Sequence, residues 1–361
     1  MMKNLNGMKH SVKSMTMKLV ALLLVVGLLP AFALAEETPA SGGEWVTFLL
    51  VCNEGMVNGG GNSGNTMMVV GMHPETGLIR LMMMTWDTFI EYEGYDVPQK
   101  LDMPYRNKGP EETMKVFNAN FGTDIGLYMS LNYLNLASLI DTYGGVDVDI
   151  TRAERNALNG MVGSKAQKIK DQANAGLLSQ MIVDSLAKEY YLNDYGPDTH
   201  LNGLQAVGFG WLQYDSVYNC CEREVNVIAD LFSSVSKTIG EKVALYTNDT
   251  GAPENTDGRR VVNLDEITDD DMVFLRQQIA PIFEMAENNL TDEDIDSISL
   301  TLARTAYEAS RQGVDIFDSL DTKVLPLEAQ EEYDVVAGAK GHLVDYEANK
   351  AAIMEFLYTE D

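Results

Sequence analysis

Short, continuous runs of apolar residues alternate along the chain with segments whose apolar residues recur at helical spacing. Trp45 to Cys52 is an apolar run of strand length, and Thr66 to Met72 and Leu78 to Met84 are two more. The last two runs are joined by His73-Pro74-Glu75-Thr76-Gly77, five turn-forming residues that end in glycine. Two strand-like runs separated by such a turn predict a β-hairpin near the start of the fold.

Helical spacing recurs in the segments that follow. Glu111 to Asn120 and Asn132 to Tyr143 each place their apolar residues on one stripe, and the second stretch stops at Gly144-Gly145. Val146 to Ile150 then alternates apolar and polar residues, as a half-buried strand does. The other expected elements are a strand over Leu204–Trp211, a helix over Glu222–Lys237, helices capped by Thr268 and Thr291, a strand over Leu320–Leu327, a hairpin over Ala337–Val344 and a helix over Tyr346–Tyr358.

The order of these elements predicts an α/β fold. Strands that alternate with helices and open with a hairpin favour a mixed central β-sheet with helices on both faces, in three αβα layers. The chain has 361 residues and 45% apolar content, which is enough to bury a large core.

Six methionines lie in the two strands of the predicted hairpin. They are Met67, Met68, Met72, Met82, Met83 and Met84. Flexible, unbranched methionine fills irregular gaps in apolar cores, and it also lines adaptable binding surfaces. We interpret the six as core filling, with a methionine-lined lipid pocket as the alternative.

The first 35 residues are typical of a secretory signal peptide. Four lysines precede the apolar run Leu19–Leu29, and Ala33-Leu34-Ala35 supplies small residues for cleavage before Glu36. The alternative is an uncleaved membrane anchor, although the apolar stretch is short for a membrane span and contains Pro30. Residues 36–44 then form a linker.

The chain is strongly acidic, with a formal net charge of −28. Removal of the signal peptide leaves 22 basic residues against 54 acidic ones, a net charge of about −32. Nucleic-acid binding depends on Lys and Arg displacing counterions from phosphates, so we exclude a nucleic acid as a partner. An anionic membrane surface is a poor partner for the same reason.

Candidate metal ligands are few. The three cysteines form no disulfide framework, and the adjacent Cys220 and Cys221 could form a bridge, bind a metal or remain idle thiols. Asp147 and Asp149 point to the same side of their predicted strand. They could hold a metal or simply form the solvated face of an edge strand. We therefore assign no metal site.

A series of short motifs along the chain gives the strongest indication of function. In chain order the motifs are Val51-Cys52-Asn53, Gly64-Asn65-Thr66-Met67-Met68, Thr85-Trp86-Asp87-Thr88, Lys100-Leu101-Asp102, Gly144-Gly145-Val146-Asp147-Val148-Asp149 and Leu201-Asn202-Gly203-Leu204-Gln205-Ala206. Their order and spacing resemble the LytR–CpsA–Psr family, also called cell envelope-related transcriptional attenuator domains. The resemblance covers residues 45–238 and continues more weakly over 289–358. It implies one domain over 45–361, with insertions at about 151–198 and 242–275.

The resemblance implies a transferase that moves a glycopolymer from a polyprenyl-pyrophosphate lipid onto the cell wall. The family's two carboxylates for a magnesium ion correspond to Asn53 and Asn65, and neutral amides weaken any Mg²⁺ shell. Arginines of the family correspond to Trp86, Trp211 and Gln213. None of these side chains can bind phosphate as a guanidinium fork does. Only if transfer activity remains would Mg²⁺ be a cofactor, and otherwise we expect none.

The residues at the family's site positions still predict a binding site. Trp86 and Trp211 could stack on sugar rings or apolar chains, or they could fill the space that two arginines vacated. The candidate ligand-binding residues are Asn53, Asn65, Trp86, Asp87, Lys100, Arg106, Trp211, Gln213 and Arg223.

The function expected from the sequence is an exported, LytR–CpsA–Psr-like envelope protein that has lost catalysis. It would bind a glycan or a polyprenyl-linked envelope lipid. The alternative is an active glycopolymer transferase with an altered site, and a third possibility is a regulator that acts through protein contacts. Metal-dependent binding of a polyprenyl pyrophosphate separates the first two.

The N-terminal pattern predicts that the mature protein begins near Glu36 and is released from the membrane. N-terminal sequencing of the exported protein should find this start, because signal peptidase cleaves after a small-residue site such as Ala33-Leu34-Ala35. Cell fractionation that recovers solely the full-length, membrane-bound chain would contradict the prediction.

Overall fold

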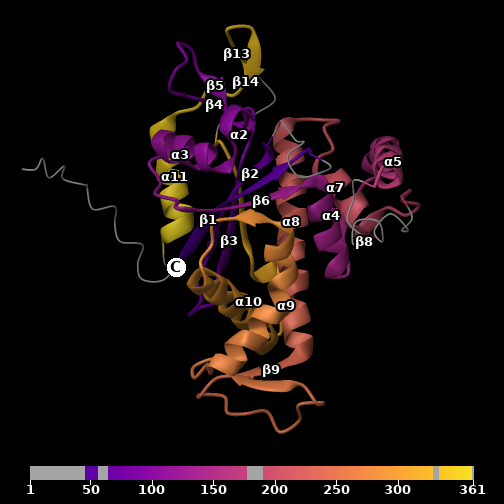
Figure 1. Ribbon diagram of the computed structural model, residues 1–361, viewed down its shortest axis with the longest axis vertical. Helices are drawn as coiled ribbons and strands as arrows, with labels where there is room; N and C mark the ends of the chain where they lie inside the picture. Colours follow the sequence, from indigo (N-terminus) through magenta and orange to yellow (C-terminus); the bar gives the residue numbers. More distant parts are fainter. Residues whose placement is uncertain (1–44, 56–63, 177–189, 328–332, 360–361) are drawn as a thin grey trace, which may run out of the picture. The chain divides into compact units, whose positions relative to one another are not determined.

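The computed structural model describes residues 45–55, 64–176, 190–327 and 333–359 (Figure 1). The predicted signal peptide and linker, residues 1–44, lie outside these ranges. Residues 44–361 form one compact unit. None of the helices in the described ranges is both long enough and apolar enough to span a membrane.

A six-stranded mixed sheet forms the centre of this unit, with the strand order β11-β6-β1-β2-β3-β12. The strands are β1 (Val46–Asn53), β2 (Gly64–Met72), β3 (Ile79–Met84), β6 (Leu127–Asn132), β11 (Glu287–Asn288) and β12 (Asp321–Leu325). β2 pairs antiparallel with β1 and β3, which confirms the predicted hairpin. β6 runs parallel to β1, and β12 runs parallel to β3.

The other described elements surround this sheet. The helices are α2 (Asp102–Lys108), α3 (Pro110–Phe121), α4 (Tyr133–Thr142), α5 (Arg152–Asn174), α7 (Gly203–Gly210), α8 (Val217–Lys242), α9 (Asp269–Met285), α10 (Asp292–Gln312), η1 (Phe317–Ser319) and α11 (Tyr346–Tyr358). Four strand pairs lie outside the main sheet: β4 (Phe89–Ile90) with β5 (Gln99–Lys100), β7 (Val146–Ile150) with β8 (Gly196–Leu201), β9 (Val243–Tyr246) with β10 (Arg260–Asn263), and β13 (Asp334–Val336) with β14 (Ala339–Gly341).

Each face of the sheet has its own apolar core, which confirms the three-layer α/β fold. Alternate residues of β1 point to opposite faces, with Phe48 and Leu50 in one core and Leu49 and Val51 in the other. Helices α4, α7, α8, α9 and α10 cover the first face, and α3 and α11 cover the second. The six methionines divide equally between the two cores and are all fully buried, so they fill the interior.

The segment Leu204–Trp211, predicted as a strand, is instead the helix α7. Asn202 begins the helix by accepting a hydrogen bond from the Gln205 N–H, and the Gln205 side chain accepts one from the Asn202 N–H in return. Every residue of α7 is buried. A helix that is apolar all round lacks the helical period that separates it from a buried strand, and this explains the wrong prediction.

The predicted caps at Thr268 and Thr291 are both confirmed as capping boxes. The hydroxyl of Thr268 accepts from the Asp271 N–H and starts α9, while Thr291 and Asp294 do the same for α10. Val146–Ile150 is the predicted strand β7, and its two aspartates face solvent. The adjacent Cys220 and Cys221 are buried, free thiols.

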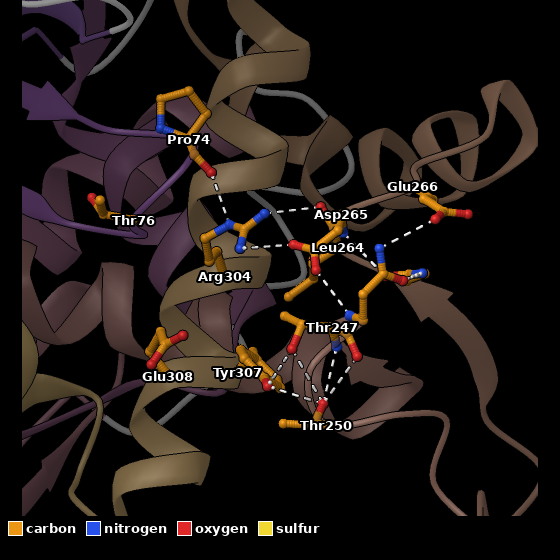
Figure 2. A network of polar contacts seen from close by, with 12 residues as sticks. Pro74, Thr76, Thr247, Thr250, Leu264, Asp265, Glu266, Arg304, Tyr307 and Glu308 are labelled. Atoms are coloured by element: carbon orange, nitrogen blue, oxygen red, sulfur yellow. Dashed lines mark hydrogen bonds and ion pairs between the residues drawn. The ribbon is translucent and has the colours of Figure 1, made fainter.

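Arg304 on α10 fastens the β2–β3 turn to the region predicted as the second insertion (Figure 2). Its guanidinium donates to the Pro74 carbonyl at 3.1 Å and to the Leu264 carbonyl at 2.8 Å, and it lies 3.7 Å from the Asp265 carboxylate. One turn further along α10, the Tyr307 hydroxyl lies 3.1 Å from the Thr247 hydroxyl. The segment after β9 is therefore held to α10 by polar contacts as well as by packing.

Replacing Arg304 should destabilise the protein more than replacing a surface arginine of the same helix. Arg304→Ala leaves two part-buried carbonyls without their donor, which costs roughly 1–3 kcal/mol of unfolding free energy. Arg311 pairs with Glu308 on the exposed surface, so Arg311→Ala is the matched control and should cost less than about 1 kcal/mol. Urea unfolding followed by circular dichroism measures both. Equal losses of unfolding free energy in the two variants would show that the polar contacts of Arg304 contribute nothing beyond helix content.

Candidate functional site

The candidate site lies along one edge of the central sheet. β1 ends at Asn53 beside the end of β6 at Asn132, and β3 ends at Met84 beside the end of β12 at Leu325. β2 begins at this same edge, because Gly64 pairs with Asn53. The carboxyl ends of the parallel strands therefore meet here, which is where open α/β sheets place ligands.

Asn53 is fixed at the end of β1 by three hydrogen bonds. Its amide nitrogen donates to the Tyr105 hydroxyl at 2.8 Å and to the Leu131 carbonyl at 3.2 Å, and its amide oxygen accepts from the Gly55 N–H at 2.9 Å. The side chain is buried, and hydrogen bonds are stronger in the low-dielectric interior of a protein than in water. Asn53 therefore acts as a structural amide that orders the strand end.

Asn65 donates from its side chain to the carboxylate of Glu54 at 2.8 Å. Glu54 is an exposed carboxylate that the motif comparison did not identify. A magnesium ion needs several convergent oxygen ligands with negative charge. Two amides already committed to hydrogen bonds and one carboxylate do not fit such an ion. The described residues contain no cluster of three or more acidic, histidine or cysteine side chains placed to hold a metal.

A cavity of about 620 Å³ opens beside Asn53. Neutral amides and hydroxyls predominate on its wall, with two acidic and two basic side chains at its margin. The lining residues are Asn53, Tyr105, Arg106, Asn107, Lys108, Gly109, Pro110, Ser130, Asn132, Asn135, Glu284, Met285, Ala286 and Glu287. We call this the amide cavity.

Trp86, Lys100 and Arg106 form a chain of contacts from the end of β3 to α2. The Lys100 ammonium lies 5.0 Å from the centre of the Trp86 ring, a cation–π contact. The Asp102 N–H donates to the Trp86 carbonyl at 3.1 Å, and the Asp102 carboxylate pairs with Arg106. Both cations are thus engaged within the protein.

Asp87 is buried and pairs with His342, a residue 255 positions further along the chain. The His342 Nδ1 lies 3.1 Å from an Asp87 carboxylate oxygen. The backbone reinforces the contact, because His342 donates to the Asp87 carbonyl and its own carbonyl accepts from the Phe89 N–H. Asp87 therefore holds the segment after β14 against the end of β3.

Trp211 lies in the interior, where its indole N–H donates to the carboxyl of Glu224 at 2.7 Å. The Thr66 hydroxyl bonds to the same carboxyl oxygen. Burial raises the pKa of Glu224 to about 8, and the Trp211 hydrogen bond only partly opposes this. Glu224 is therefore largely protonated at neutral pH, and Trp211 is a core residue that leaves no exposed ring face for a ligand.

The thiols near Glu224 are poor nucleophiles. Burial and the neighbouring Glu224 raise the pKa of Cys52 and of Cys221, and burial raises the pKa of Cys220 to about 12. Because the thiolate is the reactive form, these cysteines stay protonated and unreactive.

Arg223 faces away from the amide cavity. Its guanidinium pairs with the Asp215 carboxylate at 2.7 Å, lies 3.5 Å from Glu154 and donates to the Leu212 carbonyl. It lines a second cavity of about 640 Å³ that also contains the carboxylates of Asp147, Asp149, Glu154, Asp198, Asp230, Asp315 and Asp318. Gln213 is exposed on the segment before α8. The one retained arginine is therefore enclosed by negative charge.

The structure thus sorts the nine predicted residues into separate groups. Asn53 and Arg106 line the amide cavity, while Arg223 lines the second, acidic cavity. Sequence reasoning missed Glu54, Tyr105, Asn132, Glu224 and His342. Glu224 was within reach, since it directly follows the predicted site residue Arg223 in the sequence.

Glu224 should make the stability of the protein depend on pH. Its pKa is raised from 4.5 to about 8 on folding, so the folded state retains a proton that the unfolded chain loses. Its stabilising contribution is complete below pH 4.5 and is lost as the pH rises through 8, by at most about 1.4 kcal/mol per pH unit. Glu224→Gln keeps the shape of the side chain but cannot lose a proton, so the unfolding free energy of this variant should depend less on pH.

The informative range is pH 6 to 8, because burial also raises the pKa of Asp230, to about 6. The neighbouring exposed Glu222 provides the control, and Glu222→Gln should leave the wild-type slope unchanged. Chemical unfolding at several pH values measures each curve. Parallel curves for wild type and Glu224→Gln would refute the assignment of the buried proton.

Comparison with solved structures shows a shared fold at low sequence identity. The chain is similar to Bacillus subtilis TagV, with 14% identity, a TM-score of 0.55, and coverage of 88% of this chain and 99% of that one. It is also similar to the protein gbs0355 from Streptococcus agalactiae, with 15% identity, a TM-score of 0.54, and coverage of 88% and 89%. For TagT bound to LIIa-WTA the identity is 11%, the TM-score 0.51, and the coverage 88% and 93%.

No curated protein sequence matches the chain. The sequence pattern of the LytR_cpsA_psr family, however, matches residues 40–236, more than half of the chain. The order of motifs, the mixed three-layer fold and this match lead to one conclusion: the chain belongs to the LytR_cpsA_psr family, which transfers glycopolymers to the cell wall.

Proposed function

We propose that this protein is a non-catalytic member of its family that binds an envelope glycan in the amide cavity. The observation that carries the proposal is the state of Asn53. The family resemblance places a metal-binding carboxylate at this position, and here a neutral amide uses both its nitrogen and its oxygen to hold the local structure.

The wall of the amide cavity supports a neutral, hydroxyl-rich ligand. Asn53, Tyr105 and Ser130 already form one connected network, with 3.0 Å between the Tyr105 and Ser130 hydroxyls. Asn53 holds this network in place, and the hydroxyls of Tyr105 and Ser130 can both donate to and accept from sugar hydroxyls without a charge on either partner. A solved relative with the same fold, TagT, is known bound to LIIa-WTA, which is consistent with a ligand of the glycopolymer class.

The charges near the site oppose a pyrophosphate. Each cation among the candidate ligand-binding residues has an internal partner: Arg223 has Asp215, Arg106 has Asp102, and Lys100 lies over the Trp86 ring. A pyrophosphate would have to displace these contacts in a chain of net charge −28. Charge-assisted hydrogen bonds contribute roughly 1.5–3 kcal/mol each, so their loss removes the affinity on which transfer depends.

The family is associated with the cell envelope, which supports an envelope component as the ligand. We propose export through the N-terminal signal peptide, with release after cleavage. The protein would then bind the glycan on the outer side of the membrane.

The protein should not bind a polyprenyl pyrophosphate tightly, with or without Mg²⁺. The combined variant Asn53→Asp, Asn65→Asp, Trp86→Arg, Trp211→Arg and Gln213→Arg should gain Mg²⁺-dependent affinity, because it restores carboxylates for the metal and guanidinium groups for phosphate. Isothermal titration calorimetry on both proteins measures this difference. Micromolar, Mg²⁺-dependent binding by the wild type would show that it is a divergent transferase.

The buried position of Trp211 makes a second variant necessary. Asn53→Asp with Asn65→Asp changes two side chains at strand ends by one atom each, and circular dichroism checks that both variants fold. A phosphate-free oligosaccharide prepared from cell-wall polymer serves as the positive ligand. It should bind the wild type and bind Asn135→Ala more weakly, since Asn135 lines the amide cavity. Equal binding to both would place the glycan elsewhere.

A further inference from the structure

A third cavity, of about 720 Å³, lies on the side of the sheet that α3 and α11 cover. Figure 1 shows the elements of this region, which are α3, α11 and the β4–β5 pair. Its wall comes from the segment after β4, the end of α3 and the start of α11. The lining residues are Glu91, Tyr92, Glu93, Tyr95, Asp96, Val97, Pro98, Ala119, Asn120, Tyr346 and Glu347. The wall therefore combines tyrosine rings with carboxylates, and none of the described lysines and arginines lines it.

The aromatic part of this wall is held in place by the protein. Tyr92 and Tyr95 stack with ring centres 5.2 Å apart and planes inclined by 24°. Tyr92 is buried, whereas Tyr95 is 46% exposed. The Asn107 amide donates to the Tyr95 hydroxyl at 3.1 Å, and the Tyr346 hydroxyl donates to the Phe89 carbonyl at 3.0 Å. These bonds fix the rings before any ligand arrives.

The acidic part of the wall is fixed through the backbone, and its Glu93 interacts electrostatically with Lys108 of α2. Asn120 accepts from the Glu91 N–H and donates to the Glu91 carbonyl, both at 2.8 Å. The lining carboxylates of Glu91, Glu93, Asp96 and Glu347 are all exposed, and none of them forms a salt bridge with another described residue. The ammonium of Lys108, on α2, is paired with Glu112 at 3.0 Å. Most of the negative charge of the cavity is therefore exposed to solvent and to any ligand.

We propose that this cavity binds an organic ammonium group, either a protonated amine or a quaternary ammonium. The electron-rich face of a tyrosine attracts a cation within about 6 Å of its centre, and a quaternary ammonium is weakly hydrated, so its desolvation costs less than that of a primary ammonium. Four carboxylates around fixed rings add a favourable potential in an acidic chain. A metal ion would instead need converging oxygen ligands, and the described residues offer no such cluster.

Choline and its uncharged carbon isostere, 3,3-dimethylbutan-1-ol, provide a matched pair of probes. The folded protein should bind choline by calorimetry and bind the alcohol much more weakly, since the two differ chiefly in charge. Tyr95→Ala should weaken choline binding about two- to fivefold, and Tyr95→Phe should retain it because the ring face remains. Tyr191→Ala removes a tyrosine that is 56% exposed elsewhere and should change nothing.

Ethanolamine, tested beside choline, distinguishes a primary ammonium from a quaternary one, and binding of either supports the site. Glu93→Gln with Asp96→Asn should weaken both ligands while leaving the fold intact by circular dichroism. Equal affinity for choline and the uncharged isostere would reduce the cavity to an apolar surface. Equal choline binding by wild type and Tyr95→Ala, or its absence from the wild type, would overturn the proposal.

Discussion

The carboxyl of Glu224 joins three elements in the interior, because α8 carries it, Trp211 at the end of α7 donates to it, and Thr66 of β2 bonds to the same oxygen. An isolated charge is very costly in such a place, so the group keeps its proton at neutral pH. The packing of α7 and α8 on the sheet, and with it the shape of the candidate site, depends on this neutral contact.

The charged residues around the candidate site are also engaged by partners within the protein. Arg223, Arg106 and Lys100 each contact a carboxylate or an aromatic ring of the protein itself, and both the nitrogen and the oxygen of the Asn53 amide form hydrogen bonds with neighbouring residues. A phosphate-transfer site needs the reverse condition, in which cations and metal ligands remain available for the substrate. Internal pairing of this kind stabilises the fold at the expense of anion binding. The same internal pairing of charges occurs on several elements of the fold, and this supports the proposal that the protein has lost its transfer chemistry.

The amide cavity and the tyrosine-lined cavity are connected by one residue. Asn107 lines the first cavity, and its side chain donates to Tyr95 in the wall of the second. The first wall offers neutral hydrogen-bonding groups, and the second offers ring faces with carboxylates.

The sequence by itself determined the layers of this protein. Period-two and helical patterns, the five-residue turn, the threonine caps and the final helix are local signals, and they predicted the mixed sheet with helices on both faces. Local patterns failed at Leu204–Trp211, where burial on every side erased the period. The grouping of the site residues was decided by the tertiary structure alone. Asp87 meets His342 and Arg223 meets Glu154 across long stretches of chain, and the charge that remains available depends on those distant partners rather than on the motif itself.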